Sequence, residues 1–415
     1  MRNAPVGWAA LPLLLAALAG CQSGGGGAAT DAKAPKPTGT PVYEVRLDDQ
    51  LSAASRATTA AGSSAFTWTL SYGSAKGTAV DRTTGTQDYA KDTARAERVL
   101  DIPRRFPEDA AADLGGRSGA KPVPEVYEVK GNQVDYRTRQ GGWLRYSSQA
   151  SMDVVDLFGS ILVRAGDAAP FGGTLAEVVR NADAEKQPTK GADGSRTYEL
   201  SVPWQTAYDA LPASLVEPAM FSDRGGLVSL TVVLDGQGRL TRTSADYTSL
   251  LKWMHEGGVL KGVTSLKAEY TLTGHGSTAV PAPVAAKSGR MEDAEKALTP
   301  LAKLKPGACG SADTGLGVSL ALVRTVPCGK DADLRVFGQV KIKETIQRNP
   351  TGVADKKAGE RCRSAFRTAP DAWVADARPA GTYFTSGSSS SSSSYTGPDV
   401  EIAGDFTCYV QLSAR

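Results

Sequence analysis

Apolar and hydroxyl-bearing residues alternate strictly from Phe66 to Tyr72, in the segment Phe-Thr-Trp-Thr-Leu-Ser-Tyr. Successive side chains of a β-strand point to opposite faces of the sheet, so this pattern predicts a strand with one buried face and one wet face. Similar patterns predict seven further strands: Val126 to Val129, Gln133 to Arg137, Gly142 to Tyr146, Thr197 to Pro203, Leu227 to Leu234, Leu240 to Tyr247 and Val263 to Thr273. Glycine-rich turns such as Asp235-Gly236 separate several of them and favour hairpins, which makes the sheet mainly antiparallel.

Helical signals interrupt the strands. Four helices are expected: Val42 to Gly62, Ser151 to Arg164, Thr174 to Val179 and Ser249 to His255. The third begins with Thr174-Leu175-Ala176-Glu177, the pattern of a capping box. The segment from Ser74 to Pro124 has weak periodicity and receives no assignment. A large sheet that is wet on one side, with a few helices for the other, is typical of the α+β class.

The N-terminal residues have the composition of an export signal. One positive side chain, Arg2, precedes an apolar run from Ala9 to Ala19 that is too short for a permanent membrane span. The small pair Ala19-Gly20 before Cys21 resembles the lipobox of bacterial lipoproteins. The resemblance implies a signal peptide over residues 1–20, a diacylglyceryl group on Cys21, and a mature protein anchored at the outer face of the cytoplasmic membrane. The alternative is a buried N-terminal helix with an incidental cysteine, which Gln22 and the residues after it do not continue.

Composition divides the rest of the chain. Residues 21–41 are rich in glycine, then in proline and lysine, and form a flexible tether because they cannot bury apolar surface. Residues 42–283 carry the predicted sheet, residues 284–303 a linker with a helix from Ala285 to Leu304, and residues 304–415 a second folded unit. In this unit we expect strands at Val318 to Val326, Leu334 to Ile342 and Gly404 to Leu412, a helix at Gly359 to Arg367, and a disordered loop over the serine run Ser388 to Ser394.

Four cysteines lie in the last third of the chain: Cys309, Cys328, Cys362 and Cys408. An even set in an exported chain predicts two disulfides, and three pairings exist. We favour Cys309 with Cys328 and Cys362 with Cys408, because these local loops close with the least entropy. Free or metal-binding thiols are the alternative, but the chain has no Cys-x-x-Cys pair and no histidine beyond His275.

Little in the sequence indicates catalysis. The only histidines are His255 and His275, which leaves little room for a triad or a multi-histidine metal site, and His275 between two glycines is best interpreted as a turn residue. Ser249-Leu250-Leu251-Lys252 fits Ser-x-x-Lys, but the accompanying motifs of a penicillin-binding enzyme are missing or misplaced. With 47 basic and 44 acidic residues and no basic run, nucleic acid is not an expected partner. We therefore predict a protein that is not an enzyme and needs no metal or cofactor.

The order of these features resembles a known group of lipoproteins. The lipobox, the helix, the meandering strands with the Gly141-Gly142-Trp143 turn, the strand closed by Leu234-Asp235-Gly236, and the ending Val280-Pro281-Ala282-Pro283 look like actinobacterial lipoproteins of the LppX/LprG/LprA/LprF type, which resemble LolA and LolB. The resemblance implies a curved antiparallel half-barrel with helices on its concave face and an apolar cavity that holds the acyl chains of a lipid or glycolipid. The side chains expected to line it are Phe66, Trp68, Leu70, Tyr72, Trp143, Phe158, Ile161, Tyr198, Leu200, Leu230, Val232, Tyr270 and Leu272. The alternative is that the aromatic residues of this set simply pack in the hydrophobic core and line no cavity.

The residues after Leu304 are similar in order to the septum-formation-related domain of actinobacterial membrane proteins. Gly307-Ala308-Cys309, Val326-Pro327-Cys328, Arg361-Cys362 and Thr407-Cys408-Tyr409 carry the likeness. The histidine and glutamate that this family places after its second cysteine are missing from Asp331 to Val336. Two functions are therefore expected: an amphiphile-binding lipoprotein, or a non-enzymatic envelope scaffold that docks a protein partner during wall or septum assembly.

Overall fold

The computed structural model describes residues 41–131, 133–147, 174–212, 215, 226–285, 289–314, 322–329, 331–347, 353–377, 381, 383–393 and 399–412. All of them belong to one compact unit, Pro37–Arg415. The predicted signal peptide, Cys21 and the predicted helix from Ser151 to Arg164 lie outside the described residues. Within them, no helix combines the length and the apolar character needed to cross a membrane.

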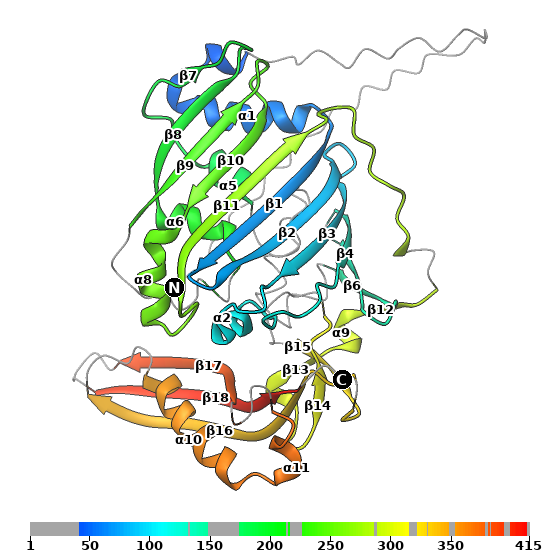
Figure 1. Cartoon of the computed structure of the whole chain (residues 1–415), viewed down its shortest axis with the longest axis vertical. Helices are drawn as coiled ribbons and strands as arrows, with labels where there is room; N and C mark the ends of the chain where they lie inside the picture. The colour runs from blue at the N-terminus through cyan, green and yellow to red at the C-terminus, as the bar shows by residue number, and fades with distance from the viewer. Residues whose placement is uncertain are drawn as a thin grey trace, which may run out of the picture. The chain divides into compact units, whose positions relative to one another are not determined.

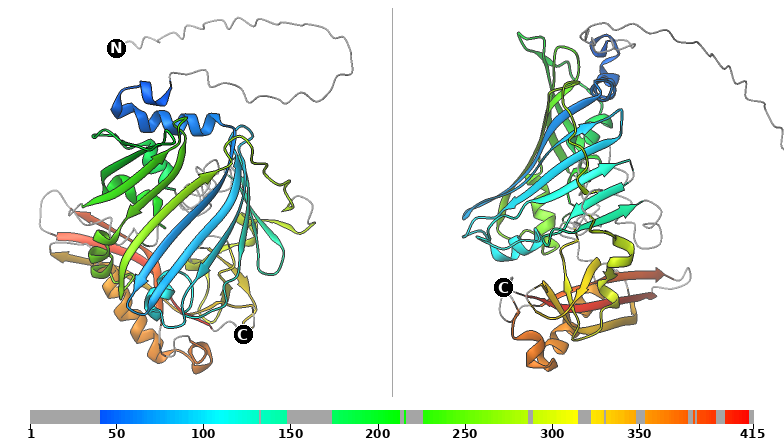
Figure 2. Two further views of the ribbon diagram at one scale, coloured as in Figure 1. Left: turned by 45° about the horizontal axis from the view of Figure 1, so that its top comes forward. Right: turned by 90° about the vertical axis from the view of Figure 1, so that its right-hand side faces the viewer.

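Twelve strands form one open, twisted sheet (Figures 1 and 2). Its order is β12-β6-β5-β4-β3-β2-β1-β11-β10-β9-β8-β7, antiparallel except for the parallel pair β12 and β6. Two meanders, β1 to β6 and β7 to β11, thus meet where β11 pairs with β1. The strands are β1 Ser63–Ser74, β2 Gly77–Asp88, β3 Thr93–Asp101, β4 Glu125–Lys130, β5 Gln133–Arg137, β6 Trp143–Ser147, β7 Thr189–Lys190, β8 Arg196–Pro203, β9 Leu227–Leu234, β10 Leu240–Asp246, β11 Val263–Thr273 and β12 Met291–Asp293.

Every strand predicted between Phe66 and Thr273 is present, with ends that differ by a few residues. The segment without an assignment contains β2, β3 and the helix α2, Glu108–Asp113. Its strands escaped prediction because β2 buries Ala79, Asp81 and Thr83 where β1 buries large apolar residues. The alternation in size and polarity is therefore too weak to predict a strand. Pairing with the neighbouring strands makes this segment extended.

Short helices pack on one face of this sheet, and α1 and α5 contact each other as well as β10. The predicted helix from Val42 to Gly62 is wrong in its first half, which forms two 3₁₀ turns before α1. Thr174 caps α5 as expected, since its Oγ1 accepts from the Ala176 amide at 3.3 Å. The helices here are η1 Val42–Glu44, η2 Leu47–Asp49, α1 Gln50–Ala60, α5 Leu175–Arg180, α6 Trp204–Ala207, η4 Tyr208–Ala210, η5 Thr248–Leu250 and α8 Leu251–Glu256.

A second sheet of six strands follows, in the order β13-β15-β14-β16-β18-β17. Helix α10, Val353–Thr368, packs against β16, β18 and β17, and α11, Asp371–Val374, contacts β16 (Figure 1). The strands are β13 Thr299–Pro300, β14 Cys309–Ser311, β15 Leu322–Val326, β16 Leu334–Gln347, β17 Phe384–Ser393 and β18 Asp399–Gln411. The chain is therefore of the mixed α+β class, and most of its regular structure is sheet.

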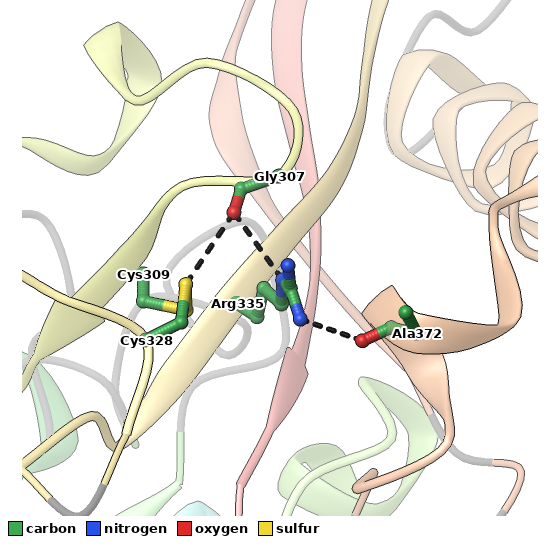
Figure 3. Close-up of a disulfide and its surroundings, with 5 residues drawn as sticks. All are labelled: Gly307, Cys309, Cys328, Arg335 and Ala372. Carbon is green, nitrogen blue, oxygen red and sulfur yellow. Dashed lines mark hydrogen bonds between the residues drawn. A yellow bond between two sulfur atoms is a disulfide. The ribbon is translucent and has the colours of Figure 1, made fainter.

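Two disulfides cross-link the C-terminal region, Cys309 to Cys328 and Cys362 to Cys408. These are the favoured pairs, and the second joins α10 to β18. Beside the first, the Arg335 guanidinium donates to the carbonyl oxygens of Gly307 at 3.2 Å and Ala372 at 2.6 Å (Figure 3). Cys328 Sγ lies 3.5 Å from the same Gly307 oxygen, although a disulfide sulfur carries no proton to donate. Arg335 thus ties the loop of the first disulfide to α11.

Two expectations for this region are wrong. The described residues of the linker, 284–285 and 289–303, form no long helix: they contain β12, the four-residue helix α9 at Ala294–Ala297, β13 and the 3₁₀ turn η7 at Leu301–Lys303. The linker instead contributes one short strand to each sheet, because β12 pairs with β6 and β13 with β15. The serine run is not a disordered loop up to Ser393, since it forms most of β17. Pairing with β18 satisfies the backbone groups on that side of the strand, which small side chains do not hinder.

Candidate functional site

The helix-covered face of the twelve-stranded sheet, here called the inner face, carries an unbroken row of residues, of which six are buried and one, Gly85, is partly buried. Residues directly opposite each other on antiparallel strands point to the same side. Strand register places seven such residues across β6 to β11: Leu144, Tyr136, Tyr127, Ala96, Gly85, Phe66 and Leu272. The Tyr127 and Tyr136 rings lie 5.2 Å apart between centroids. The inner face is thus continuous across both meanders.

A second row runs parallel to the first from β2 to β8. It consists of Thr83, Trp68, Tyr270, Thr243, Val232 and Tyr198. All six are buried, and the Trp68 and Tyr270 rings meet edge to face at 6.2 Å. Helix α5 contacts β10 and β11 above this row, with Leu175, Val178 and Val179 buried. The opposite face is polar: an open groove of about 600 Å³ there is lined by hydroxyl and charged residues including Thr69, Arg82 and Lys267.

Most residues predicted to line a cavity meet on the inner face. Trp143 is buried but alternates with Leu144 and Tyr146, so it points to the other side of β6. Phe158 and Ile161 lie outside the described residues. The remaining ten belong to one hydrophobic cluster: Phe66, Trp68, Leu70, Tyr72, Tyr198, Leu200, Leu230, Val232, Tyr270 and Leu272. That they contact a ligand stays a prediction.

Small residues lie on the inner face of β2 and β3. Ala94 and Ala96 are buried on the inner face, and Gly85 lies between Ala96 and Phe66 in the first row. A Cβ atom at Gly85 would lie 2.7 Å from the Phe66 ring and 2.3 Å from the Arg95 carbonyl oxygen. Glycine is therefore required for the Phe66 ring to lie across β2.

Four buried polar groups of the inner layer have no hydrogen-bond partner among the described residues. They are the Tyr72 hydroxyl, Thr243 Oγ1, Trp204 Nε1 and Gln87 Oε1. Tyr72 and Thr243 are fully buried and Trp204 is 5 % exposed. Burial, with a smaller contribution from nearby Asp81, raises the pKa of Tyr72 well above its ordinary value. Each unmade hydrogen bond costs about 1–3 kcal/mol in a sealed core, so these atoms mark places where a polar group of a ligand would be stabilising.

A buried ion cluster lies at the β3 end of the second row. Arg98 stands directly opposite Thr83 on one side and Glu125 on the other. Its guanidinium binds both oxygens of Asp81, at 2.8 and 2.7 Å, and Glu125 Oε2 at 3.0 Å. Burial alone lowers the pKa of Arg98, but the two carboxylates outweigh it and raise that pKa well above its ordinary value. Sequence reasoning missed all three residues because they come together only through strand register.

The histidines and the possible metal ligands of the described residues do not gather at the inner face. No group of three metal-ligating side chains occurs among the described residues. His255 lies on α8 and His275 in the turn that follows β11. Burial and the nearby Arg239 lower the pKa of His275, so it is a neutral turn residue near pH 7.

Comparison with known proteins adds a distant structural likeness. No family model and no curated protein matches the chain. The lipoprotein LppX of Mycobacterium tuberculosis is 12% identical, with a TM-score of 0.27 over 56% of this chain and 98% of its own. The MucA/MucB complex of Pseudomonas aeruginosa is 10% identical, with a TM-score of 0.25 over 86% and 93%. Such scores carry no functional conclusion, and the site is defined by the contacts of this chain alone.

Proposed function

We propose that this protein binds the apolar part of a lipid or other amphiphile against the inner face, without catalysing a reaction. One observation carries the proposal: the buried Tyr72, Thr243 and Trp204 have a hydroxyl or indole group without a partner among the described residues, and they lie in a mainly apolar layer that spans the sheet. A sealed core would leave those atoms unsatisfied, whereas an amphiphile brings both apolar chain and polar atoms. Burial of apolar surface is worth about 25 cal/mol per Å², enough for one acyl chain to bind after its ordering cost.

The proposal includes an extracytoplasmic place for the protein. The lipobox-like sequence before Cys21 supports a diacylglyceryl anchor, since two acyl chains suffice for stable attachment to a membrane. The ligand-binding layer would then stand close to the membrane that supplies its ligand.

An envelope scaffold is the second candidate, and a specific observation favours it. The inner-face residues already belong to one continuous hydrophobic cluster with α1 and α5, as in a layer that is simply packed. In that case the C-terminal region, with its resemblance to septum-formation-related domains, would dock the partner.

Native mass spectrometry separates the two candidates. The unit Pro37–Arg415, expressed in a lipid-bearing host, is expected to carry a noncovalent adduct that disappears under denaturing conditions. Thr243→Val removes an unpartnered hydroxyl while keeping the shape, so adduct occupancy should fall several-fold while stability is unchanged or higher. Thr231→Val, half-exposed on the outer face of β9, is the matched control and should leave occupancy unchanged. A clean apo mass for the parent unit would remove the lipid-binding proposal and leave the scaffold.

The anchor has its own test. With Cys21→Ser, no thioether can form, and we expect the chain to remain an uncleaved precursor or to appear in the medium. Ser23→Ala, two residues away, keeps the cysteine and should be processed as usual. Metabolic labelling with a radioactive fatty acid reads out both variants. Normal lipid labelling of the Cys21→Ser chain would show that this cysteine is not the attachment site.

A further inference from the structure

The four edges of the two sheets are not alike. The twelve-stranded sheet ends in β12, with three residues, and β7, with two. One edge of the six-stranded sheet is β13, with two residues, one of which is Pro300. Very short strands and proline protect sheet edges against pairing with another chain. The remaining edge is β17, with ten residues. Three edges are therefore protected and one is long.

Strand β17 also lacks the other protective features. Its sequence, Phe-Thr-Ser-Gly followed by six serines, contains no charge and no proline. It pairs with β18 from Phe384 to Ser393 without a register shift, so no bulge turns the edge away. Among the described residues no strand pairs with its other edge. Ser390, Ser391 and Ser392 are exposed. Helix α10 and the 3₁₀ turn η7 contact β17, but neither adds a strand to its outer edge.

We propose that β17 pairs with β17 of a second copy of this chain, antiparallel about a two-fold axis, to make one continuous sheet of twelve strands. A two-fold contact brings the same residues of both copies together. A serine strand suits this contact, because every opposed pair contains at least one serine when all ten residues of both copies overlap, and cross-strand hydroxyls hydrogen-bond. A different protein would be selected through side-chain pockets at alternate positions, which serines do not form.

The size of the contact sets its strength. Ten residues on each side exchange about ten backbone hydrogen bonds, since every second opposed pair makes two. A typical protein interface has a similar number, but a strand edge buries less area than the standard stable interface. We therefore expect a dimer with a dissociation constant in the micromolar range. The described strands of each copy include one long edge, so the assembly closes at two copies rather than growing into a fibre.

Charges on the neighbouring strands do not oppose the contact. On the face of the sheet that carries Ser390, the next strands hold the balanced ion pairs Lys341–Asp405, at 3.5 Å, and Lys343–Glu401, at 3.8 Å. Opposite signs alternate there, so two copies would meet without a net repulsive field. The dimer requires neither the inner-face ligand nor the lipid anchor.

Cysteine cross-linking of the full chain in detergent tests the contact. Ser390→Cys and Ser391→Cys place thiols on the β17 edge strand, while Thr345→Cys is equally exposed but lies on β16, two strands away. Mild oxidation is expected to give at least about tenfold more covalent dimer from the β17 variants than from Thr345→Cys. Equal yields at all three positions would overturn the proposal.

Sedimentation velocity over a concentration series supplies the second measurement. The double change Ser390→Lys and Ser392→Lys puts like charges on both copies and should raise the dissociation constant at least about tenfold. The matched change to threonine at both positions should keep the dimer, because threonine suits a strand and adds no charge. Intact disulfides and an unchanged unfolding midpoint show that the lysine variant is folded. A parent chain that stays monomeric throughout, or forms open-ended aggregates that lysine does not prevent, would contradict the two-fold contact.

Discussion

Replacing Arg98 by alanine is expected to lower the free energy of unfolding by about 3–5 kcal/mol, because it leaves two carboxylates without their cation in the buried layer. The Arg98 side chain is 8 % exposed and that of Asp81 11 %. Both Asp81 oxygens and one Glu125 oxygen accept from it. The Glu125 side chain is 31 % exposed and keeps contact with water, so most of the loss comes from the buried Asp81 carboxylate. Urea unfolding followed by tryptophan fluorescence measures the loss.

Arg242→Ala is the matched control. Arg242 binds Glu269 at 2.6 Å on the outer face, and these side chains are 56 % and 43 % exposed. Solvent screens such a pair, so its loss should cost at most about 1 kcal/mol. A triple variant, Asp81→Leu, Arg98→Met and Glu125→Leu, should recover most of the stability that Arg98→Ala loses. If Arg98→Ala and Arg242→Ala cost the same, the cluster is not buried in solution as it is here.

The alternation of apolar and polar residues was sufficient to predict many of the strands, but other strands have no such alternation. In β1, β9 and β11 the alternation of apolar and polar residues reports directly which face is buried, and those strands were predicted. In β17 every side chain after Gly387 is serine, so no pattern exists. Its extended form comes from ten backbone pairs with β18. An edge strand specified by its neighbour carries little signal of its own.

The residues of the candidate site were likewise predictable from the sequence only in part. Alternation could identify Trp68, Tyr198 and Tyr270 as inner-face residues, and register then places them in one row with Thr243. The ion cluster could not be identified, since Arg98 lies 17 residues from Asp81 and 27 from Glu125. A charged residue in a strand normally indicates the wet face. Only the paired register of β2, β3 and β4 shows that these charges point inward.

The disulfides give the second large expected effect, and the two should differ. In the chain-entropy model, closing the 46-residue separation between Cys362 and Cys408 is worth about 4 kcal/mol, and the 19-residue separation between Cys309 and Cys328 about 3 kcal/mol. Cys362 and Cys408 are also fully buried, next to Phe337 and Val410 in a small hydrophobic cluster. Changing both to alanine therefore removes buried sulfur as well as the cross-link, whereas Cys328 is exposed.

We accordingly expect the Cys362→Ala and Cys408→Ala double variant to lose about 4 kcal/mol or more, and the Cys309→Ala and Cys328→Ala variant about 3 kcal/mol or less. Exchange requires a thiolate to reach a sulfur, so a mild reductant should open Cys309–Cys328 first. Timed alkylation and peptide mapping give the order, and urea unfolding gives the losses. Faster reduction of Cys362–Cys408 would mean that α10 separates readily from β18, and the packing that buries this bond would then contribute little to the stability of the region.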